Sequence, residues 1–255
     1  GQLVAFMDYL FHAMFSIMLF CTVFMMYPRA EVSAKRIEEV FNLDPIIKNK
    51  PADSDFDEKV SIEFDHVTFV YPDGEEPVLQ DVSFKANKGE MIAFIGSTGS
   101  GKSTLVNLVP RFYDVSSGSI KINGKDIRDY DVLELRDKLG VIPQKAVLFS
   151  GTIADNIRFG KKDASDEEVE YAAKVAQAYP FIMEKENGFD EEISEGATNV
   201  SGGQKQRLSI ARALVRKAQI YIFDDSFSAL DFKTDAILRK ELKKEMTESI
   251  MLVVA

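Results

Sequence analysis

The glycine-rich segment 96–104 constrains the fold of this chain more than any other part of its sequence. The segment, GSTGSGKST, fits the pattern G-x-x-x-x-G-K-[ST], which binds nucleotide phosphates. The apolar run Met91–Ile95 precedes it and predicts a buried parallel strand. Residues 104–109 can open a helix, which Pro110 limits. Because strand, loop and helix follow in this order, we favour a phosphate-binding loop over a plain glycine-rich turn.

The residue types in this loop suit phosphate chemistry. Glycines let backbone N–H groups turn inward, where larger side chains would block a phosphate. Lys102 can reach the outer phosphates, and the hydroxyl of Ser103 can bind Mg²⁺. The predicted phosphate-binding residues are Gly96, Ser97, Thr98, Gly99, Ser100, Gly101, Lys102, Ser103 and Thr104.

Charge and cysteine usage narrow the classes of function. The net charge of −10 argues against a nucleic-acid partner, because a phosphate backbone needs a positive surface. The single cysteine, Cys21, excludes an internal disulfide and fits a reducing compartment. A length of 255 residues allows one large domain or two small ones.

The first segment of the chain has the composition of a membrane helix. Residues 10–27 are almost entirely apolar and contain no Lys or Arg, which is enough for most of a membrane crossing. Arg29, Lys35 and Arg36 follow and predict that this end lies on the cytoplasmic side. The alternative is a buried helix of a soluble protein. His12 could line a substrate path or be an ordinary residue of the span, and the sequence leaves both open.

The rest of the chain divides into two further segments. We place the membrane segment at 1–29, a cytoplasmic helix and linker at 30–59, and a soluble domain at 60–255. Apolar residues at helical spacing extend the helix past Pro28, and Pro45 should stop it. The polar stretch 48–59 predicts the linker.

The order of elements in the soluble domain predicts an α/β fold with a parallel-sheet core. An antiparallel β piece comes first, and a helical insert occupies about 150–200. We expect the helix of residues 132–139 to end at Gly140. The expected elements are one bent strand or a strand pair at 61–71, strands at 78–84, 119–122, 141–142, 220–223 and 250–254, a hairpin turn at 123–124, and helices within 152–187 and 235–248.

Two more signals lie downstream of the loop. Four apolar residues precede Asp224 and Asp225, and a carboxylate at the end of such a strand can hold Mg²⁺, a role that Asp224 fits. Residues 201–204, SGGQ, precede a helical pattern, and a serine with paired glycines can direct several N–H groups at an anion. By itself that segment also fits a plain N-cap with a flexible turn.

Together these residues resemble the nucleotide-binding domain of an ATP-binding cassette (ABC) transporter of the exporter type. The resemblance begins near Ile62 and runs to the end, and the first segment looks like the last transmembrane helix of a half-transporter. It implies a P-loop NTPase fold, ATP and Mg²⁺ as ligands, and ATP hydrolysis coupled to transport. It also implies a multi-pass protein of the cell membrane with a cytoplasmic nucleotide-binding domain. Membrane lipid and a second half-transporter are the implied partners, and the transported substrate stays open.

The resemblance also assigns roles to single residues. Tyr71 looks like the aromatic residue that stacks on adenine, and Gln144 looks like the glutamine that senses Mg²⁺ and the attacking water. The implied metal residues are therefore Ser103, Gln144 and Asp224.

The SGGQ segment matches the signature of the family, which adds Ser201, Gly202, Gly203 and Gln204 to the nucleotide-binding residues. In this family each ATP lies between the phosphate loop of one domain and the signature of another. Lys102 and Ser201 of one chain therefore should not serve the same ATP.

Asp225 departs from the family pattern, which has Glu at this position as the base that activates water. The side chain is one methylene shorter, so its carboxylate falls roughly an ångström or more short of the water, and misplacement on that scale can lower a rate about a hundredfold. Heterodimeric exporters of the family often pair such an Asp and an intact signature with a partner that has the Glu and an altered signature. We therefore expect a heterodimer subunit whose own site, with Lys102, Gln144 and Asp225 as catalytic residues, turns over slowly. The alternative is a homodimer in which Asp225 is a working base.

Two other classes of ATP-binding protein fit this sequence less well. The acidic balance disfavours an ABC ATPase of DNA repair or chromosome structure, and the apolar segment disfavours a soluble importer ATPase. A regulatory module that binds ATP without hydrolysing it stays open. Since the chain stops before the family's switch-loop residue, we expect a fragment of a longer transporter.

Overall fold

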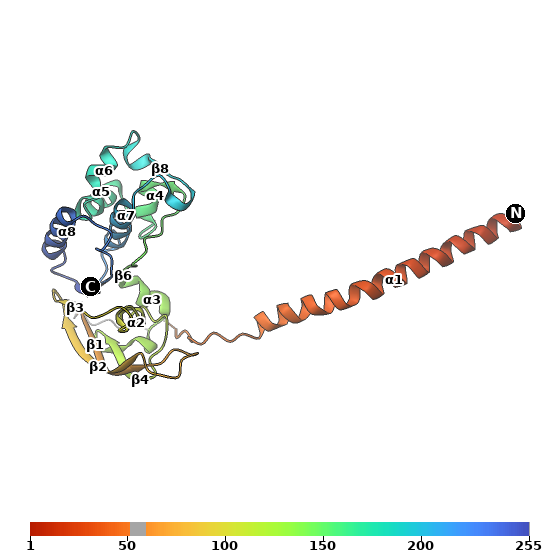
Figure 1. Cartoon of the computed structure of the whole chain (residues 1–255), viewed down its shortest axis with the longest axis horizontal. Coiled ribbons are helices and arrows are strands. Elements are labelled where there is room, and N and C mark those ends of the chain that lie inside the picture. The colour runs from red at the N-terminus through yellow and green to blue at the C-terminus, as the bar shows by residue number, and fades with distance from the viewer. Residues whose placement is uncertain (52–59, 255) are drawn as a thin grey trace. The chain divides into compact units, whose positions relative to one another are not determined.

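The computed structural model describes residues 1–51 and 60–254, and the chain divides into two units, Gly1–Lys48 and Asn49–Ala255. The first unit contains one helix, α1 (Gln2–Phe41), which continues through Pro28 as predicted and ends before Pro45 (Figure 1). Its most apolar window has a mean hydropathy of 1.9, so it is long and apolar enough to cross a membrane. The predicted linker falls largely on residues 52–59, which lie outside the described residues, as does Ala255.

An antiparallel sheet opens the second unit. Its strands lie in the order β2-β1-β4-β5, and β1 pairs with both β2 and β4 through irregular registers. Residues 61–69 therefore form one bent strand rather than a pair. The predicted turn at Asn123 and Gly124, with φ of 54° and 79°, joins β4 to β5. The bounds are β1 (Ser61–Phe69), β2 (Leu79–Asn87), β4 (Ser117–Ile122) and β5 (Lys125–Asp126).

A parallel sheet forms the middle layer. Its strands are β3 (Met91–Phe94), β10 (Ile250–Val254), β9 (Ile220–Asp224) and β6 (Leu139–Ile142), in that spatial order. Successive side chains of β9 pack in different hydrophobic clusters on opposite faces of the sheet, because side chains alternate across a strand. Ile222 packs with the antiparallel sheet, and Phe223 packs with the helices that cover the other face.

Two expectations for this sheet are wrong. Met91 is 53% exposed, because β3 is the edge strand of the described sheet rather than a buried one. Gly140 lies inside β6 and does not end a helix. A Cβ at Gly140 would lie 2.6 Å from the ring of Tyr221, its neighbour across the sheet, so the glycine makes room for that ring.

The helices gather mainly on one side of this unit, where Figure 1 shows α4 to α8 opposite β1, β2 and β4. The expected helical insert contains α4, α5 and α6, together with the short pair β7 (Gly151–Thr152) and β8 (Glu192–Ile193). The last helix spans 232–245, not the expected 235–248, because the Asp231 side chain accepts the N–H of Thr234 and caps it. The bounds are α2 (Lys102–Leu108), α3 (Val132–Asp137), α4 (Ile153–Arg158), α5 (Asp166–Val175), α6 (Tyr179–Met183), α7 (Gly202–Leu214) and α8 (Phe232–Glu245).

Candidate functional site

The glycine-rich loop connects β3 to α2, in the predicted context. Gly101, directly before α2, has a φ of 84°, a left-handed conformation that glycine adopts readily. A Cβ there would lie 3.0 Å from the carbonyl oxygen of Val78, and a Cβ on Gly96 would lie 2.9 Å from Ser100 Oγ. The loop is therefore a backbone cradle with no room for side chains at these two positions.

A cavity of about 440 Å³ lies over this cradle. Gln144, which follows β6, and Asp225, which follows β9, line it together with the loop, so three segments distant in sequence meet here. Sequence reasoning missed Val78 and Val254, although Val254 could have been found from its place at the carboxyl end of a parallel strand. The lining residues are Val78, Gly96, Thr98, Gly99, Ser100, Gly101, Lys102, Ser103, Thr104, Gln144, Asp225 and Val254.

The ammonium group of Lys102 lies over the loop. Its Nζ donates to the carbonyl oxygens of Gly96 at 2.5 Å and Ser97 at 3.0 Å. The α2 N-terminus beside it has no side-chain cap among the described residues. The loop thus concentrates a cation and backbone N–H donors at one point, which suits a polyanion.

The oxygen donors beside the loop suit Mg²⁺. Ser103 Oγ donates to Asp224 Oδ1 at 2.8 Å, and Gln144 Nε2 donates to Asp225 Oδ2 at 2.8 Å. Hydroxyl, amide and carboxylate oxygens are the hard ligands that Mg²⁺ prefers. The described residues contain no cluster of three or more His, Cys, Asp or Glu that could hold a metal. The protein would therefore supply few ligands, as is usual where phosphates and water complete the coordination of Mg²⁺.

A buried serine, Ser226, fixes the chain directly after Asp224 and Asp225. Ser226 is only 1% exposed, and its Oγ donates to the carbonyl oxygen of Ile142 at 2.8 Å, which joins the ends of β9 and β6. Asp225 has a φ of 46°, a left-handed conformation that Asp tolerates better than most residues. Sequence reasoning missed Ser226, and its position next to Asp225 was the only available signal.

Tyr71 lies against the start of α2. Its hydroxyl is hydrogen-bonded to Thr104 Oγ1 at 2.9 Å, and its ring makes edge contacts with Phe69 and Tyr113. This contact places Tyr71 beside the phosphate loop, and its stacking on adenine stays a prediction.

The signature segment forms the start of α7, away from the cavity. Ser201 Oγ accepts the N–H of Gln204 at 3.3 Å, and Gln204 Oε1 accepts the N–H of Ser201 at 2.9 Å. This reciprocal pair is a capping box. None of residues 201–204 lines the phosphate cavity. A Cβ on Gly203 would lie 3.1 Å from the carbonyl oxygen of Ala229, so the signature packs on the loop that follows β9.

Arg207 supports the signature from the next turn of α7. Its Nε donates to the carbonyl oxygen of Gly203 at 3.3 Å, and its guanidinium also donates to Gln177 at 2.8 Å. Burial lowers the pKa of Arg207 from its ordinary value, and Phe181 lies against the guanidinium plane. These contacts tie the signature to the helical insert.

Known proteins resemble this chain in sequence and in overall structure. The sequence model of the family described as ABC transporter matches residues 79–228. An uncharacterised ABC transporter ATP-binding protein of Mycobacterium bovis is 39% identical over 100% of this chain and 44% of its own length. A Staphylococcus aureus protein named as a multidrug export ATP-binding/permease protein is 46% identical over 76% of this chain and 34% of its own length.

A solved structure agrees with these relatives. A bacterial Atm1-family ABC exporter with ATP bound superposes with a TM-score of 0.84 at 34% identity, covering 92% of this chain and 41% of that one. The chain thus spans less than half the length of the proteins that it matches. It belongs to the ABC transporter family, and its α/β unit is the ATP-binding domain of that family in the form found in exporters.

Proposed function

We propose that this chain is part of a half-transporter that uses ATP binding and hydrolysis to drive export across the cell membrane. The observation that supports this most directly is the meeting of Lys102, Gln144 and Asp225 around one phosphate cradle. The named S. aureus relative and the exporter with bound ATP support the same activity. In this proposal α1 lies among membrane lipids as one helix of a multi-pass domain, and the ATP-binding domain is cytoplasmic.

The polar residues in and beside the cavity have distinct roles in this proposal. Lys102 and the loop N–H groups bind the outer phosphates, and Tyr71 stacks on the adenine. Ser103, Gln144 and Asp224 hold Mg²⁺, which supplies positive charge to the phosphates when it is bound. Gln144 and Asp225 orient the water that attacks the terminal phosphate in line.

The position of the signature implies a second ATP-binding domain. Residues 201–204 do not line the cavity of their own chain, so they are free to complete a site built on the loop of a partner. The short side chain of Asp225 supports slow turnover at the chain's own site. We propose a heterodimer in which the partner carries Glu at this position and this chain lends its signature to the faster site.

The test compares variants in the complete transporter, purified with the subunit that associates with it. In a heterodimer with a slow site, Asp225→Asn lowers steady-state ATPase activity by less than twofold, while Ser201→Arg lowers it about a hundredfold. If Asp225→Asn abolishes turnover as fully as the Glu→Gln change in the partner, the slow-site proposal is wrong. Recovery of a single subunit type with full activity supports the homodimer instead.

A second measurement separates the slow enzyme from a module that never hydrolyses ATP. The complete transporter is loaded with radiolabelled ATP, and the retained nucleotide is analysed over hours. Conversion of all bound ATP to ADP supports two hydrolytic sites, whereas ATP that persists in half of the sites supports a purely regulatory role for this chain's loop.

A further inference from the structure

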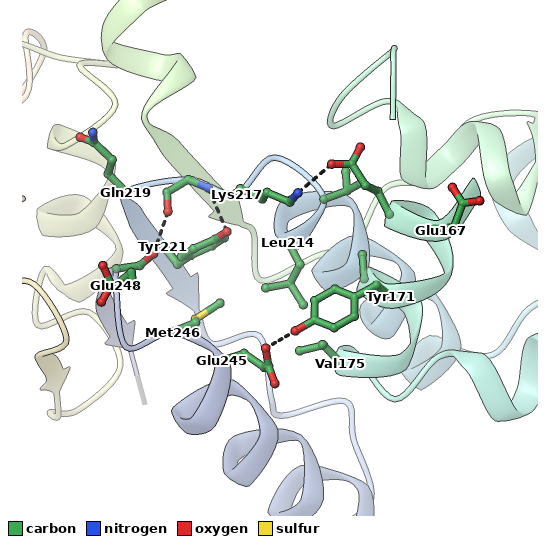
Figure 2. Close-up of a pocket in the computed structure, with 15 residues that line it drawn as sticks. Glu167, Tyr171, Val175, Leu214, Lys217, Gln219, Tyr221, Glu245, Met246 and Glu248 are labelled. Carbon is green, nitrogen blue, oxygen red and sulfur yellow. Dashed lines mark hydrogen bonds and ion pairs between the residues drawn. The ribbon is translucent and has the colours of Figure 1, made fainter. Parts of the chain in front are cut away.

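A second cavity, larger than the phosphate site, lies between the helical insert and the end of α8. Its volume is about 520 Å³, within the range of small-molecule sites, and it shares no lining residue with the phosphate cavity. Residues of α5, the end of α7, the start of β9 and the end of α8 surround it. Figure 2 shows Leu214 and Met246 pointing into the space between Tyr171 and Tyr221.

The inner wall of this cavity is apolar. Tyr221 is 4% exposed and Met246 is 6% exposed, and Val175 and Val215 are also buried. The polar atoms of this wall already have partners: Tyr221 Oη accepts the N–H of Ala218 at 2.9 Å, and Ser249 Oγ donates to the Ala218 carbonyl at 2.8 Å. The wall thus offers contact area for an apolar body rather than for hydrogen bonds.

The rim of the cavity is acidic. Four carboxylates and one ammonium line it, those of Glu167, Glu168, Glu245, Glu248 and Lys217. Lys217 pairs with Glu168 at 2.7 Å, and the pKa of Glu168 is lowered to about 2 by hydrogen bonds from Lys217 and Lys161. The ammonium of Lys217, the one cation among the described residues of the lining, is thus already paired with Glu168.

Two of the other carboxylates pair with lysines: Lys88 pairs with Glu248 and Lys244 with Glu245, and neither lysine lines the cavity. The Lys88–Glu248 pair is exposed, and exposed pairs contribute little. Tyr171 donates its hydroxyl to Glu245, as Figure 2 shows, and this bond raises the pKa of Tyr171, so the phenol stays a neutral donor. The carboxylate of Glu245 is thereby held at the cavity edge, next to an aromatic ring.

We propose that this cavity is a second ligand site, for a small organic cation with an aromatic or branched apolar body. The body occupies the wall of Leu214, Tyr221 and Met246, and the cationic group lies between Glu245 and the exposed ring of Tyr171. An aromatic face and a carboxylate both attract a cation, and both would repel an anion of the same shape. The occupant contacts α5, α8 and Tyr221 of β9, so it bridges the helical insert, α8 and the start of β9.

The test uses two dyes of one skeleton and opposite charge. The full chain in nanodiscs of zwitterionic lipid, without nucleotide, is titrated into rhodamine 6G or fluorescein while fluorescence anisotropy is followed, with empty nanodiscs as the blank. We expect saturable binding of rhodamine 6G beyond the blank and about tenfold weaker binding of fluorescein. Equal binding of the two dyes, or no rhodamine binding beyond the blank, overturns the proposal.

Matched variants locate the site. Glu245→Gln and Tyr171→Ala should each weaken rhodamine 6G binding about fivefold. Asp235→Asn, on the same helix but outside the lining, should leave it unchanged. If Asp235→Asn and Glu245→Gln behave alike, the dye binds elsewhere. Circular dichroism confirms that each variant is folded, and because no ATP is present the result is independent of the proposed transport activity.

Discussion

Two helices of the ATP-binding domain begin at glycine-rich segments, but the described side chains cap the first N–H groups of only one of them. Helix α2 begins after the left-handed Gly101 with no side-chain cap among the described residues, so its first N–H groups face the cavity. Helix α7 begins at Ser201, whose capping box with Gln204 already uses two of the N–H groups. The phosphate loop is therefore open to a ligand, whereas the signature is a helix end capped by its own side chains, and its contact with a partner's nucleotide stays a proposal.

Within this comparison, the largest expected effect concerns Lys102, the only ammonium among the described residues that line the phosphate cavity. Lys102→Ala removes a charge-assisted contact and should lower the ATP affinity of the chain's own loop by about 2 kcal/mol, or roughly thirtyfold. Titration of the full chain with a fluorescent ATP analogue measures this. Lys88→Ala is the control, and equal affinities of the two variants would show that the loop does not bind ATP as described.

Ser226 tests how far the phosphate cavity depends on contacts between strands. Ser226→Ala removes the hydrogen bond to Ile142 and should cost about 1 kcal/mol of folding free energy. Because Asp225 and Gln144 follow the two joined strands, single-turnover hydrolysis of the ATP bound at the chain's own loop should slow roughly tenfold, with little change in ATP affinity. Ser209→Ala, a buried serine of α7 outside the phosphate cavity, is the control for stability. A fall in stability without slower single-turnover hydrolysis at this loop would make Ser226 purely structural.

Ser201 tests the role of the side-chain cap at the start of α7. Ser201→Ala removes the cap of α7 and should lower the free energy of unfolding by about 1 kcal/mol. The ATP affinity of the chain's own loop should not change, because Ser201 does not line that cavity. Chemical denaturation and nucleotide titration measure the two effects, and Ser201→Asn, which keeps a cap, should restore the stability. A loss of ATP affinity as large as that of Lys102→Ala would erase the distinction between the two helix ends.

The smallest expected effect is a pH dependence beside the signature. A hydrogen bond with Thr234 lowers the pKa of Asp231 below its ordinary value of 3.8. The cap of α8 therefore stabilises the fold above pH 3.8 and is lost as the pH falls through the lowered pKa. Asp231→Asn keeps a capping oxygen that does not titrate, so its melting temperature should fall less than that of the wild type between about pH 5 and pH 2. Parallel curves for both proteins would show that this cap carries no pH dependence.

Local sequence determined the elements that depend on neighbouring residues. The order of Met91–Ile95, the glycine-rich loop and α2 followed from a strand pattern, glycine spacing and Pro110. The strand that ends at Asp224 and the Asn123-Gly124 turn were predictable for the same reason. The serine with paired glycines before a helical pattern also predicted Ser201 as a helix start, which the capping box confirms.

Contacts between distant segments were decided only by the tertiary structure. Gly140 carried the pattern of a helix end, but the ring of Tyr221 in the neighbouring strand requires a glycine there. Ser226 is important because β6 and β9 are adjacent, and Val78 lines the cavity because β2 begins beside the loop. The second cavity exists because α5 and α8 pack across the start of β9. The sequence alone thus predicted the phosphate loop and the signature. The packing of the sheet and helices decided how far apart these two segments lie. That distance depends on tertiary contacts, which local sequence patterns do not encode.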